Sequence, residues 1–478
     1  MINKRNVDEN AKNLIKLLNK YGFEAYLVGG CVRDLLLNKT PKDWDICTNA
    51  KPQEIISVLR KNNIKFCTPG IEFGTVVALV ETREIHGKVD EGPGCAKLVK
   101  KVSEYEITTY RAETAYRDNR HPDEVKFIGD LKSDLSRRDF TINAMAYNPI
   151  TNELVDYFNG QEHLSRGIIE TVGDAEERFS EDSLRILRAI RFAVRYNFSI
   201  SLDTASAMKT CVNLLDNVSK ERITQELEKM LTCGKNIKHY FTMYSFVIER
   251  IIPEIAKCIN FDQNNKYHTH DVYLHMLYVV DNCKTNKFEI KLAALLHDIG
   301  KPDAYIEDAQ GQGHFYGHPQ ISYEICKQML DKNFRLTNEQ KDRVLELVKY
   351  HDMTIATTKK SVKRALNKHG KGFLEDWFIL KQADMDDHIY PNKKHRYVID
   401  IDYIRKTMEE IVSANECFTI KDLSINGKDI MEITNTKPGK HIGTILNALL
   451  EKVIDEEIEN DLDILKNEAL KLWGELEK

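Results

Sequence analysis

Apolar and polar residues follow two different patterns along this chain. Up to about Pro149, helix-like periods of three to four residues alternate with short extended runs. Beyond about Phe179, strand signals nearly vanish and apolar residues recur at helical spacing. The patterns predict helices at 11–19, 32–37, 52–61, 184–194, 223–231, 272–280, 290–296 and 344–348, and strands at 24–28, 44–47, 75–80 and 105–110. We therefore expect an α+β protein with an α/β head followed by an all-α body.

Polar residues cluster between periodic segments at three places, near Pro149, at 260–265 and at 391–395. These places predict four parts: a head at 1–149, a helical neck and body at 150–262, a third part at 263–392 and a helical tail at 393–478. The polar, glycine-bearing stretch 82–104 lies between two predicted strands, and we interpret it as a loop or a hairpin extension.

The composition is that of a globular protein. The 478 residues are 42% hydrophobic, which is enough for several buried cores. No apolar run is long enough to span a bilayer, and the N-terminal sequence MINKRNVDEN lacks the apolar segment of a secretory signal. The ten cysteines form no Cys-x-x-Cys motif, which is typical of reduced thiols rather than of a disulfide framework or a zinc ribbon. We therefore expect a cytoplasmic protein with no membrane contact.

The net charge of −5 does not by itself indicate a nucleic-acid binder. Local basic clusters can still contact phosphates. One cluster recurs at helical spacing and the other is a short basic run: Arg185, Arg188, Arg191 and Arg195, and Lys359, Lys360, Lys363, Arg364 and Lys368. For the second cluster, a solvated helix face is the favoured interpretation.

The stretch 27–48, LVGGCVRDLLLNKTPKDWDICT, carries the strongest chemical signal. Gly29 and Gly30 stand between a predicted strand and a predicted helix, a turn that can bring backbone N–H groups onto a triphosphate. Asp43 and Asp45 alternate along an extended run and should point to the same face. Two such carboxylates can share Mg²⁺ ions that clamp the attacking and leaving oxygens of a phosphoryl displacement. Each motif alone would more often be a plain turn or a solvated strand edge, but together they predict nucleotidyl transfer.

Further polar residues extend this candidate site. Glu106 lies in another predicted strand and is a candidate third carboxylate, although an outward-facing strand glutamate is equally compatible with the pattern. The adjacent Arg137 and Arg138 are suited to phosphate charge. Asp139 and Asn143 are suited to sugar hydroxyls and metal-bound waters.

Six segments occur in order between residues 27 and 192: LVGGCVRDLLLN, DWDICT, EFGTVVALV, EITTYR, RRDFTINAMA and EDSLRILRAIRF. In these the chain resembles the class II tRNA nucleotidyltransferases, which are the bacterial CCA-adding enzymes and their poly(A) polymerase relatives. The resemblance implies a polymerase-β-like nucleotidyltransferase head that extends tRNA with CTP, ATP and Mg²⁺. It implies catalytic metals at Asp43 and Asp45, a triphosphate pocket at Gly29, Gly30, Arg33 and Asp34, and nucleotide contacts from Arg138 and Asp139.

The same family uses its EDSLR segment as a protein template for the incoming base. Here Asp182 and Arg185 would hydrogen-bond the Watson–Crick edge, with Arg188 and Arg191 as further nucleotide-binding residues. Positions i and i+3 share a helix face, so this pair could present an acceptor beside a donor. Without the upstream segments, a plain surface ion pair would be the better interpretation.

The resemblance also implies which nucleotides the protein adds to the RNA. The family's flexible loop, which is associated with the switch from C to A addition, matches at YRDNRHP through Asp118 and Arg120. The basic segment that marks the poly(A) polymerase branch is replaced here by PGIEFGTVV. Complete CCA addition is therefore favoured, and a poly(A) polymerase or a partial CC- or A-adding enzyme is the alternative.

A second set of metal-ligand side chains lies in the third part of the chain: His275, His297, Asp298 and Asp384, with His318 and His351 as further candidates. The set resembles the HD phosphohydrolase superfamily, in which such residues bind a divalent metal. Imidazoles and carboxylates from separate helices are suited to a transition metal. The resemblance implies hydrolysis of phosphate esters, including 2′,3′-cyclic phosphates. The alternative is a structural helical body that helps to hold tRNA.

Two rival functions are compatible with the sequence. The chain could be chiefly a metal-dependent phosphohydrolase acting on RNA ends, or a non-enzymatic RNA-binding scaffold. The scaffold leaves the paired aspartates of the head unexplained. In the tail, Gly439 and Gly443 could present backbone N–H groups to an RNA phosphate, or they could belong to a plain helix cap.

Overall fold

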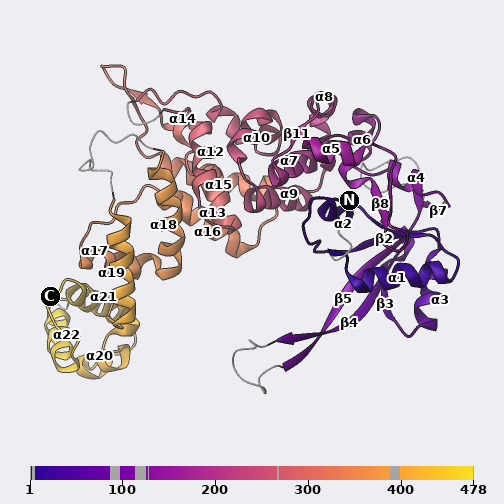
Figure 1. Cartoon of the computed structure of the whole chain (residues 1–478). Helices are drawn as coiled ribbons and strands as arrows, with labels where there is room; N and C mark the ends of the chain where they lie inside the picture. Colours follow the sequence, from indigo (N-terminus) through magenta and orange to yellow (C-terminus); the bar gives the residue numbers. More distant parts are fainter. Residues whose placement is uncertain are drawn as a thin grey trace. The chain divides into compact units, whose positions relative to one another are not determined.

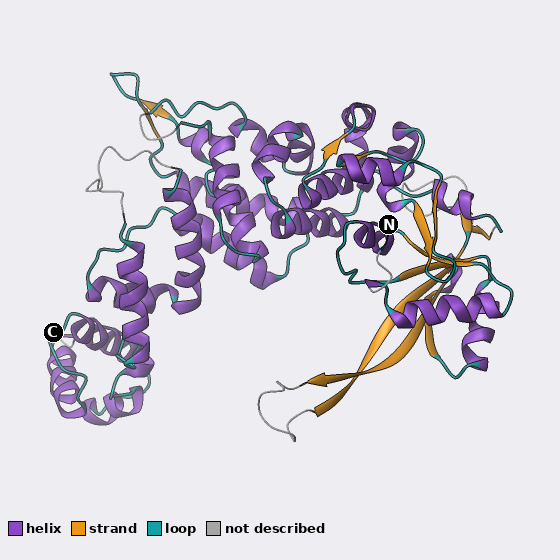
Figure 2. Cartoon of the chain, in the orientation of Figure 1, coloured by secondary structure: helices purple, strands orange, loops and turns teal. Residues whose placement is uncertain are grey.

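The computed structural model describes residues 2, 6–86, 97–113, 125–127, 129–265, 269–387 and 399–476. The chain divides into two compact units, Met1–Ile251 and Ile252–Lys478. The long strands all belong to the first unit, and helices dominate the second (Figure 1, Figure 2). The α+β fold class predicted from the sequence is confirmed. Over the ranges given above, no helix is both long and apolar enough to cross a membrane.

The head is built on a mixed sheet. Within the described ranges it has seven strands, in the order β3-β4-β5-β2-β1-β8-β9. These strands are β1 (Ala25–Val28), β2 (Asp45–Thr48), β3 (Lys65–Gly70), β4 (Thr75–His86), β5 (Lys97–Thr109), β8 (Met145–Asn148) and β9 (Glu153–Asp156). Strands β2 and β5 run parallel, whereas the other neighbours are antiparallel. Strand β9 extends the sheet past residue 149, where the sequence pattern placed the end of the head.

Amphipathic helices accompany this sheet. They are α1 (Glu9–Lys20), α2 (Gly30–Leu36), α3 (Pro52–Lys61) and α4 (Leu131–Ser136), and a small ribbon pairs β6 (Arg111–Glu113) with β7 (Val125–Phe127). Helix α1 begins where the side chain of Asp8 accepts a hydrogen bond from the backbone N–H of Ala11 at 2.8 Å. The apolar stripe of α1 is buried in the head. The predicted helices 11–19, 32–37 and 52–61 are confirmed to within two residues at each end.

The stretch 82–104 continues the hairpin of β4 and β5. The two strands stay in register from Thr75 opposite Thr108 to His86 opposite Lys97, on either side of residues 87–96, which lie outside the described residues. In Figure 1 the pair extends beyond the rest of the sheet as a two-stranded arm. The hairpin alternative of the sequence interpretation is therefore confirmed.

The rest of the first unit is mainly helical. Its elements are α5 (Gly160–Arg166), β10 (Ile168–Ile169), α6 (Ala175–Glu181), α7 (Leu184–Tyr196), β11 (Ser199–Ile200), α8 (Leu202–Cys211), α9 (Lys220–Cys233), α10 (Ile237–Met243) and α11 (Ser245–Ile251). Helix α7 packs against α9 and buries an apolar stripe that includes Ile186, Leu187 and Ile190. Two arginines of α7 contact the head: Arg188 donates to the side chain of Asp139, and Arg185 donates to the backbone carbonyl of Arg137.

The second unit is a helical assembly. Its elements are α12 (Val272–Asn282), α13 (Phe288–Leu296), α14 (Lys301–Ala304), β12 (Ile306–Glu307), β13 (Gly313–His314), α15 (His318–Asn333), α16 (Asn338–Tyr350), α17 (Lys359–His369), α18 (Lys371–Met385), α19 (Ile401–Ser413), α20 (Gly427–Thr434), α21 (Lys440–Ile454) and α22 (Leu462–Leu476). Helix α13 is apolar on nearly all sides and is surrounded by α12, α16 and α18. The residues that follow α13 therefore lie in the interior.

The basic cluster of α17 is matched by acidic neighbours. Lys359 and Lys363 pair with Glu416 at 2.6 and 2.8 Å. Lys360 and Arg364 of the same helix pair with Asp455 at 3.0 and 2.7 Å. The cluster thus forms ion pairs with the segment after α19 and with the C-cap of α21, rather than a purely solvated face. In the tail, Gly439 is the N-cap of α21, a helix start that both interpretations of this segment expected, and Gly443 lies within that helix.

Candidate active sites

Three carboxylates meet where β2 begins. Asp45 is the first residue of β2 and is the register partner of Glu106 on the parallel strand β5. Asp43 lies in a bend before β2, so the loop and not strand alternation places it. Burial raises the pKa of Asp45 to about 6, and the negative charges of Glu106 and Asp43 act in the same direction. Crowded carboxylates of this kind are the ligands that hard divalent cations prefer.

The turn before α2 brings the backbone close to these carboxylates. Gly29 has φ 76°, a left-handed conformation that glycine adopts without strain. A Cβ atom at this position would lie 2.9 Å from Nη1 of Arg138 and 3.9 Å from Oδ2 of Asp45. The two-glycine turn predicted from the sequence is therefore packed directly against the carboxylate site.

We expect Gly29→Ala to lower the free energy of unfolding by about 1–3 kcal/mol, because the side chain is strained at positive φ and collides with Arg138. Urea denaturation measures the change. Gly443→Ala is the matched control, because Gly443 lies inside a helix and its Cβ would meet no atom within 4 Å. The control should raise stability by about 0.5–1 kcal/mol. Equal effects of the two changes would contradict the packing described for Gly29.

A hydrogen-bond network links α2, the segment before β8 and α7. The guanidinium of Arg33 donates to Oδ1 of Asn143 at 2.5 Å and to Oδ1 of Asp34 at 3.0 Å. The amide of Asn143 donates to Asp139 at 3.0 Å, and Arg188 donates to the other oxygen of Asp139 at 2.9 Å. The structure thus brings together five residues that the sequence analysis placed in the nucleotide site.

Asp139 is held as an anion within this network. Burial alone would raise its pKa, but the charge of Arg188 and the hydrogen bond from Asn143 outweigh burial and keep the pKa below its ordinary value. The pKa of the Arg188 guanidinium is raised in the same pair. Burial alone would lower this pKa, but the negative charge of Asp139 outweighs burial. The pair is a fixed polar contact between the head and α7.

Asp134 is a site residue that the sequence analysis missed. Its carboxylate is almost completely buried and pairs with Arg137 at 2.9 Å and with Arg138 at 3.4 Å. It also accepts a hydrogen bond from the backbone N–H of Arg111 at 3.3 Å. The sequence did offer a signal for these ion pairs, because Asp134 precedes Arg137 by three residues and Arg138 by four at the end of a short helix. Asp134 orients the arginine that lies beside Asp45 and Gly29.

The structure corrects the geometry expected for the base-recognition pair. Asp182 is the C-cap of α6 with extended dihedral angles, and Arg185 lies in the first turn of α7, so the two do not share a helix face. Asp182 accepts a hydrogen bond from Arg222 of α9 at 2.8 Å. Arg185 pairs with Glu181 at 2.7 Å. The two residues lie at a junction between helices, and each is held by another partner.

Two further parts of the predicted site stand apart from this network. Arg191 pairs with Glu226 of α9 at 2.5 Å, so its guanidinium serves the contact between α7 and α9. Arg191 and Glu226 are both buried. Asp118 and Arg120 of the expected flexible loop lie outside the described residues.

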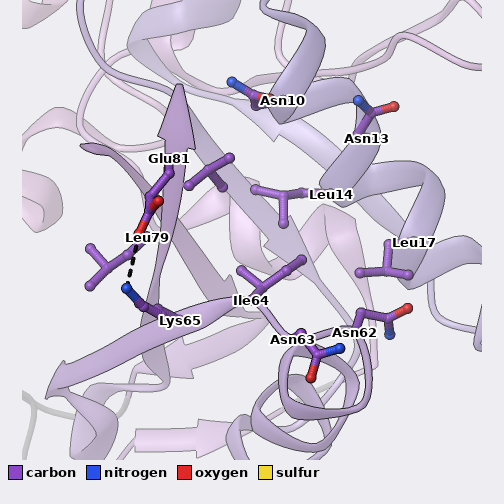
Figure 3. Close-up of a pocket in the computed structure, with 11 residues that line it drawn as sticks. Asn10, Asn13, Leu14, Leu17, Asn62, Asn63, Ile64, Lys65, Leu79 and Glu81 are labelled. Carbon is purple, nitrogen blue, oxygen red and sulfur yellow. Dashed lines mark hydrogen bonds and ion pairs between the residues drawn. The ribbon is translucent and has the colours of Figure 1, made fainter. Parts of the chain in front are cut away.

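A pocket of about 560 Å³ lies on another part of the head (Figure 3). It is formed by α1, the end of α3, β3 and β4. Its lining is Asn10, Asn13, Leu14, Leu17, Asn62, Asn63, Ile64, Lys65, Leu79, Val80 and Glu81. None of the predicted site residues is among them, and its two charged groups, Lys65 and Glu81, pair with each other at 2.9 Å.

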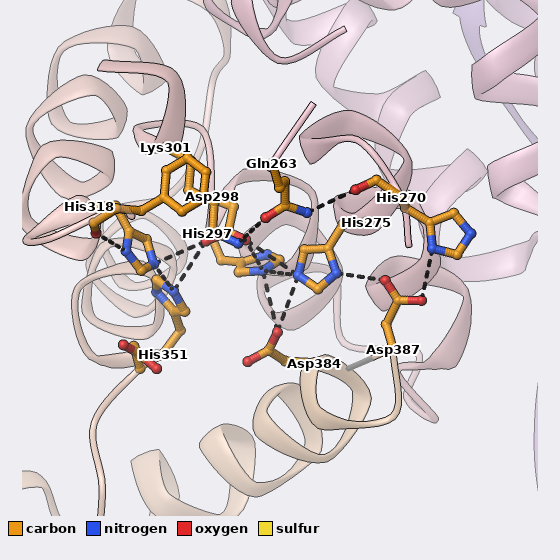
Figure 4. Close-up of polar contacts among 12 residues, drawn as sticks. Gln263, His270, His275, His297, Asp298, Lys301, His318, His351, Asp384 and Asp387 are labelled. Carbon is orange, nitrogen blue, oxygen red and sulfur yellow. Dashed lines mark hydrogen bonds and ion pairs between the residues drawn. The ribbon is translucent and has the colours of Figure 1, made fainter. Parts of the chain in front are cut away.

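The histidines and aspartates predicted in the second unit converge (Figure 4). His297 and Asp298 follow α13, and they meet His275 from α12 and Asp384 from α18. Oδ2 of Asp298 lies 3.3 Å from Nε2 of His275 and 3.2 Å from Nε2 of His297. Oδ1 of Asp384 lies 3.2 Å from the same nitrogen of His275. Two imidazoles and two carboxylates thus face one another in a buried place, as a divalent transition metal requires.

Neighbouring groups hold these candidate ligands in position. Nδ1 of His275 lies 2.8 Å from Oδ2 of Asp387, which the sequence analysis missed. Burial alone would lower the pKa of His275, but hydrogen bonds to Asp298, Asp384 and Asp387 raise it to about 10. A cation bound among these carboxylates therefore competes with a proton on His275. The buried Lys301, which follows the His-Asp pair in the HDIGK segment, donates to Asp298 at 2.7 Å.

Comparisons with known proteins agree with this division of sites. Family models match residues 25–170 ("Poly A polymerase head domain"), 197–259 ("Probable RNA and SrmB- binding site of polymerase A"), 266–391 ("HD domain") and 332–469 (tRNA nucleotidyltransferase domain 2). The CCA-adding enzyme of Ligilactobacillus salivarius is 32% identical over 474 residues, which cover 98% of each chain.

Solved structures show the same similarity. The Bacillus stearothermophilus CCA-adding enzyme in complex with CTP is 25% identical, with a TM-score of 0.69 and 98% of each chain covered. The Thermotoga maritima CCA-adding enzyme complexed with tRNA shares the fold at 22% identity, with a TM-score of 0.58. The alignment covers 98% of this chain and 97% of that chain. The near full-length identity to the Ligilactobacillus salivarius enzyme, together with the geometry of the head, shows that this chain belongs to the CCA-adding enzymes.

Proposed function

We propose that the head adds C, C and A to the 3′ end of tRNA, using CTP and ATP without a nucleic-acid template and releasing pyrophosphate. The observation that carries this proposal is the cluster of Asp43, Asp45 and Glu106 beside the Gly29 turn and Arg138. The complexes of two family members, one with CTP and one with tRNA, support the same substrates for this chain.

The proposed roles follow from position and charge. Asp43 and Asp45 would hold Mg²⁺, with Glu106 as a third carboxylate, and the metal would supply charge stabilisation to the phosphoryl group. The 3′ hydroxyl of tRNA attacks the α-phosphate of the nucleotide, and the oxygen between the α- and β-phosphates leaves with pyrophosphate. Gly29, Gly30, Arg33, Asp34 and Arg138 would shape the triphosphate pocket, and Asp139 and Asn143 would contact the sugar. Positioning and electrostatics would supply most of the rate enhancement.

Asp182 and Arg185 are proposed to select the base, with Arg222 and Glu181 holding them in place. We expect Asp182→Ala to lower the preference for CTP and ATP over UTP and GTP by about 10- to 100-fold, because one hydrogen-bond acceptor for the base is lost. Competition assays with all four nucleotides measure the change.

Asp216→Ala is the matched control for this variant. Asp216 is an exposed carboxylate of the same unit that also pairs with an arginine, Arg250. The control should leave nucleotide preference unchanged. An Asp182→Ala enzyme with wild-type preference would contradict the base-selection role.

The direct test is to incubate the protein with tRNA lacking its CCA end, Mg²⁺, CTP and ATP, and to sequence the products. Addition of three residues, C, C and A, is the expected result. A product that stops after two cytidines would identify a CC-adding enzyme, and a long A tail would identify a poly(A) polymerase. Absence of any addition would overturn the proposal.

The four-part division at 1–149, 150–262, 263–392 and 393–478 is also proposed, with RNA contacts in the second and fourth parts. Three family models support it in outline, because they begin in the head, the neck and the third part, whereas the fourth, at 332–469, spans the proposed boundary at 392. The flexible-loop role of Asp118 and Arg120 belongs to the same proposal.

We infer a second activity, the metal-dependent hydrolysis of phosphate esters by the HD cluster. The observation that favours it is that His275, His297, Asp298 and Asp384 converge in the second unit with hardly any exposure to solvent. Hydrolysis of a 2′,3′-cyclic nucleotide, measured with and without added Mn²⁺, tests this activity. Absence of metal-dependent hydrolysis would leave the cluster a structural element.

A further inference from the structure

Two aromatic rings of α7 hold the side chain of Arg33, which belongs to α2. The guanidinium carbon of Arg33 lies over both rings, 5.3 Å from the centre of Phe192 and 4.9 Å from that of Tyr196. The rings are stacked on each other, with centres 6.3 Å apart and planes inclined by 18°. They are four residues apart in one helix, so a single face of α7 presents both of them. The electron-rich ring faces attract the buried guanidinium and restrict its position.

Tyr196 also contacts α2 through its hydroxyl group. This hydroxyl donates a hydrogen bond to Oδ1 of Asp34 at 3.1 Å, and Nη2 of Arg33 donates to the same oxygen at 2.9 Å. Two further cations lie near the Tyr196 ring, the ammonium of Lys39 at 4.8 Å and the guanidinium of Arg195 at 5.4 Å from its centre. Tyr196 therefore joins α7 to α2 by two independent interactions, one through its ring and one through its hydroxyl.

The held guanidinium fixes the orientation of an amide in the nucleotide site. Nη1 of Arg33 donates to Oδ1 of Asn143, and Nδ2 of Asn143 donates to Asp139. Because the oxygen end faces a donor and the nitrogen end faces an acceptor, the Asn143 amide has one favoured orientation. Arg188 of α7 donates to the other oxygen of Asp139. The chain of contacts thus leaves α7 at its aromatic pair and returns to α7 at Arg188.

We propose that Tyr196 is a positioning residue that sets the discrimination between ribonucleotides and deoxyribonucleotides. It acts through Arg33 on the amide of Asn143, which the proposed function places against the nucleotide sugar, and the inference rests on that sugar contact. A ribose 2′ hydroxyl is recognised only where a donor or an acceptor stands at a fixed position. Loss of the aromatic support would release the guanidinium and, with it, the orientation of the amide.

Recognition of the base should be spared when Tyr196 is changed. Arg185, proposed to select the base, lies at the other end of α7, about 16 Å away along the helix axis at 1.5 Å per residue. Helix α7 is also held independently of the Tyr196 ring, because it packs against α9 and Arg191 pairs there with Glu226. The inference therefore predicts a selective loss of sugar discrimination rather than a general loss of specificity.

Tyr196→Leu, which removes the ring and the hydroxyl, tests the inference. The kcat/KM for the first addition to tRNA lacking its CCA end is measured with CTP, dCTP and UTP. We expect the preference for CTP over dCTP to fall by about 5- to 20-fold and the preference for CTP over UTP to change by less than about twofold. Reduced stability alone would lower all three rates by one common factor, because it changes only the fraction of active protein. Tyr196→Phe keeps the ring and should restore the CTP to dCTP ratio to within about threefold of the parent.

Tyr21→Leu is the matched control. Tyr21 lies elsewhere in the head, has the ammonium of Lys61 over its ring at 5.7 Å, and accepts a hydrogen bond from Asn62 at 3.2 Å. This variant should leave both nucleotide ratios unchanged. If Tyr196→Leu is unfolded by circular dichroism, Arg33→Lys takes its place: it leaves α7 intact and keeps the charge but loses the planar set of donors, and it should show the same selective loss.

An unchanged CTP to dCTP ratio in the folded variant, or an equal fall in both ratios, would overturn the positioning role of Tyr196. Asn143→Ala, assayed in parallel, separates this role from the proposed function. If Asn143→Ala changes the CTP to dCTP ratio and Tyr196→Leu does not, the sugar contact stands and the inference fails. If neither variant changes the ratio, the proposed sugar contact fails with it.

Discussion

Asp45→Asn should reduce nucleotide addition to tRNA by at least about a thousand-fold, which corresponds to about 4 kcal/mol of lost transition-state stabilisation. The substitution keeps the shape of the side chain and removes the charge that would hold the metal. Glu106 lies opposite Asp45 on the neighbouring strand, and its negative charge helps to raise the pKa of Asp45. Incorporation of labelled CTP under single-turnover conditions measures the effect.

The fold should survive this substitution, because burial and neighbouring carboxylates already disfavour the charged form of Asp45. The matched control is Glu81→Gln, which neutralises a carboxylate of the same sheet that pairs with Lys65. Both variants should unfold close to the temperature of the parent, and the control should keep full activity. An Asp45→Asn enzyme with near-parental incorporation would remove the basis for assigning catalysis to this cluster.

Asp298→Asn should abolish both metal binding in the second unit and phosphate-ester hydrolysis, with a loss of rate of at least about a thousand-fold. One carboxylate oxygen of Asp298 faces His275 and His297 and the other faces His318 and His351, so the neutral isostere removes the charge that all four imidazoles face. Addition of CCA should be unaffected, because the carboxylates proposed for it lie in the other unit. Cyclic-nucleotide hydrolysis and CTP incorporation, measured on the same preparation, separate the two activities.

Asp303→Asn is the control for this prediction. Asp303 lies five residues along the chain, is 40% exposed and pairs with Lys257 at 2.7 Å, so its charge takes no part in the cluster. It should retain both activities. If hydrolysis persisted in Asp298→Asn, the phosphatase activity would have to arise elsewhere.

Much of the architecture could be predicted from local sequence. Helix 52–61 was predicted at its observed bounds, because Pro52 at the first turn and an apolar stripe specify it locally. The strand around Asp45 was placed one residue early. The strand signals in the head and their near absence after about Phe179 were sufficient for the α+β class.

Other features required the three-dimensional structure. The sequence spacing of Asp182 and Arg185 suggested one helix face, but a break between α6 and α7 separates them. Spacing within a segment cannot reveal that Arg222 of a different helix holds Asp182. Partners that are far apart in sequence also neutralise the basic run of α17.

The sequence by itself determined which chemical groups are available: glycines at the turn, paired carboxylates, and histidines next to an aspartate. These are local properties, because residue type and short-range periodicity set them. Only the tertiary structure decided which groups meet. Packing of α13 among α12, α16 and α18 places Asp298 between two pairs of histidines, and the parallel pairing of β2 with β5 sets Glu106 beside Asp45. Such contacts join residues far apart along the chain, so they depend on the folded core and not on any local pattern.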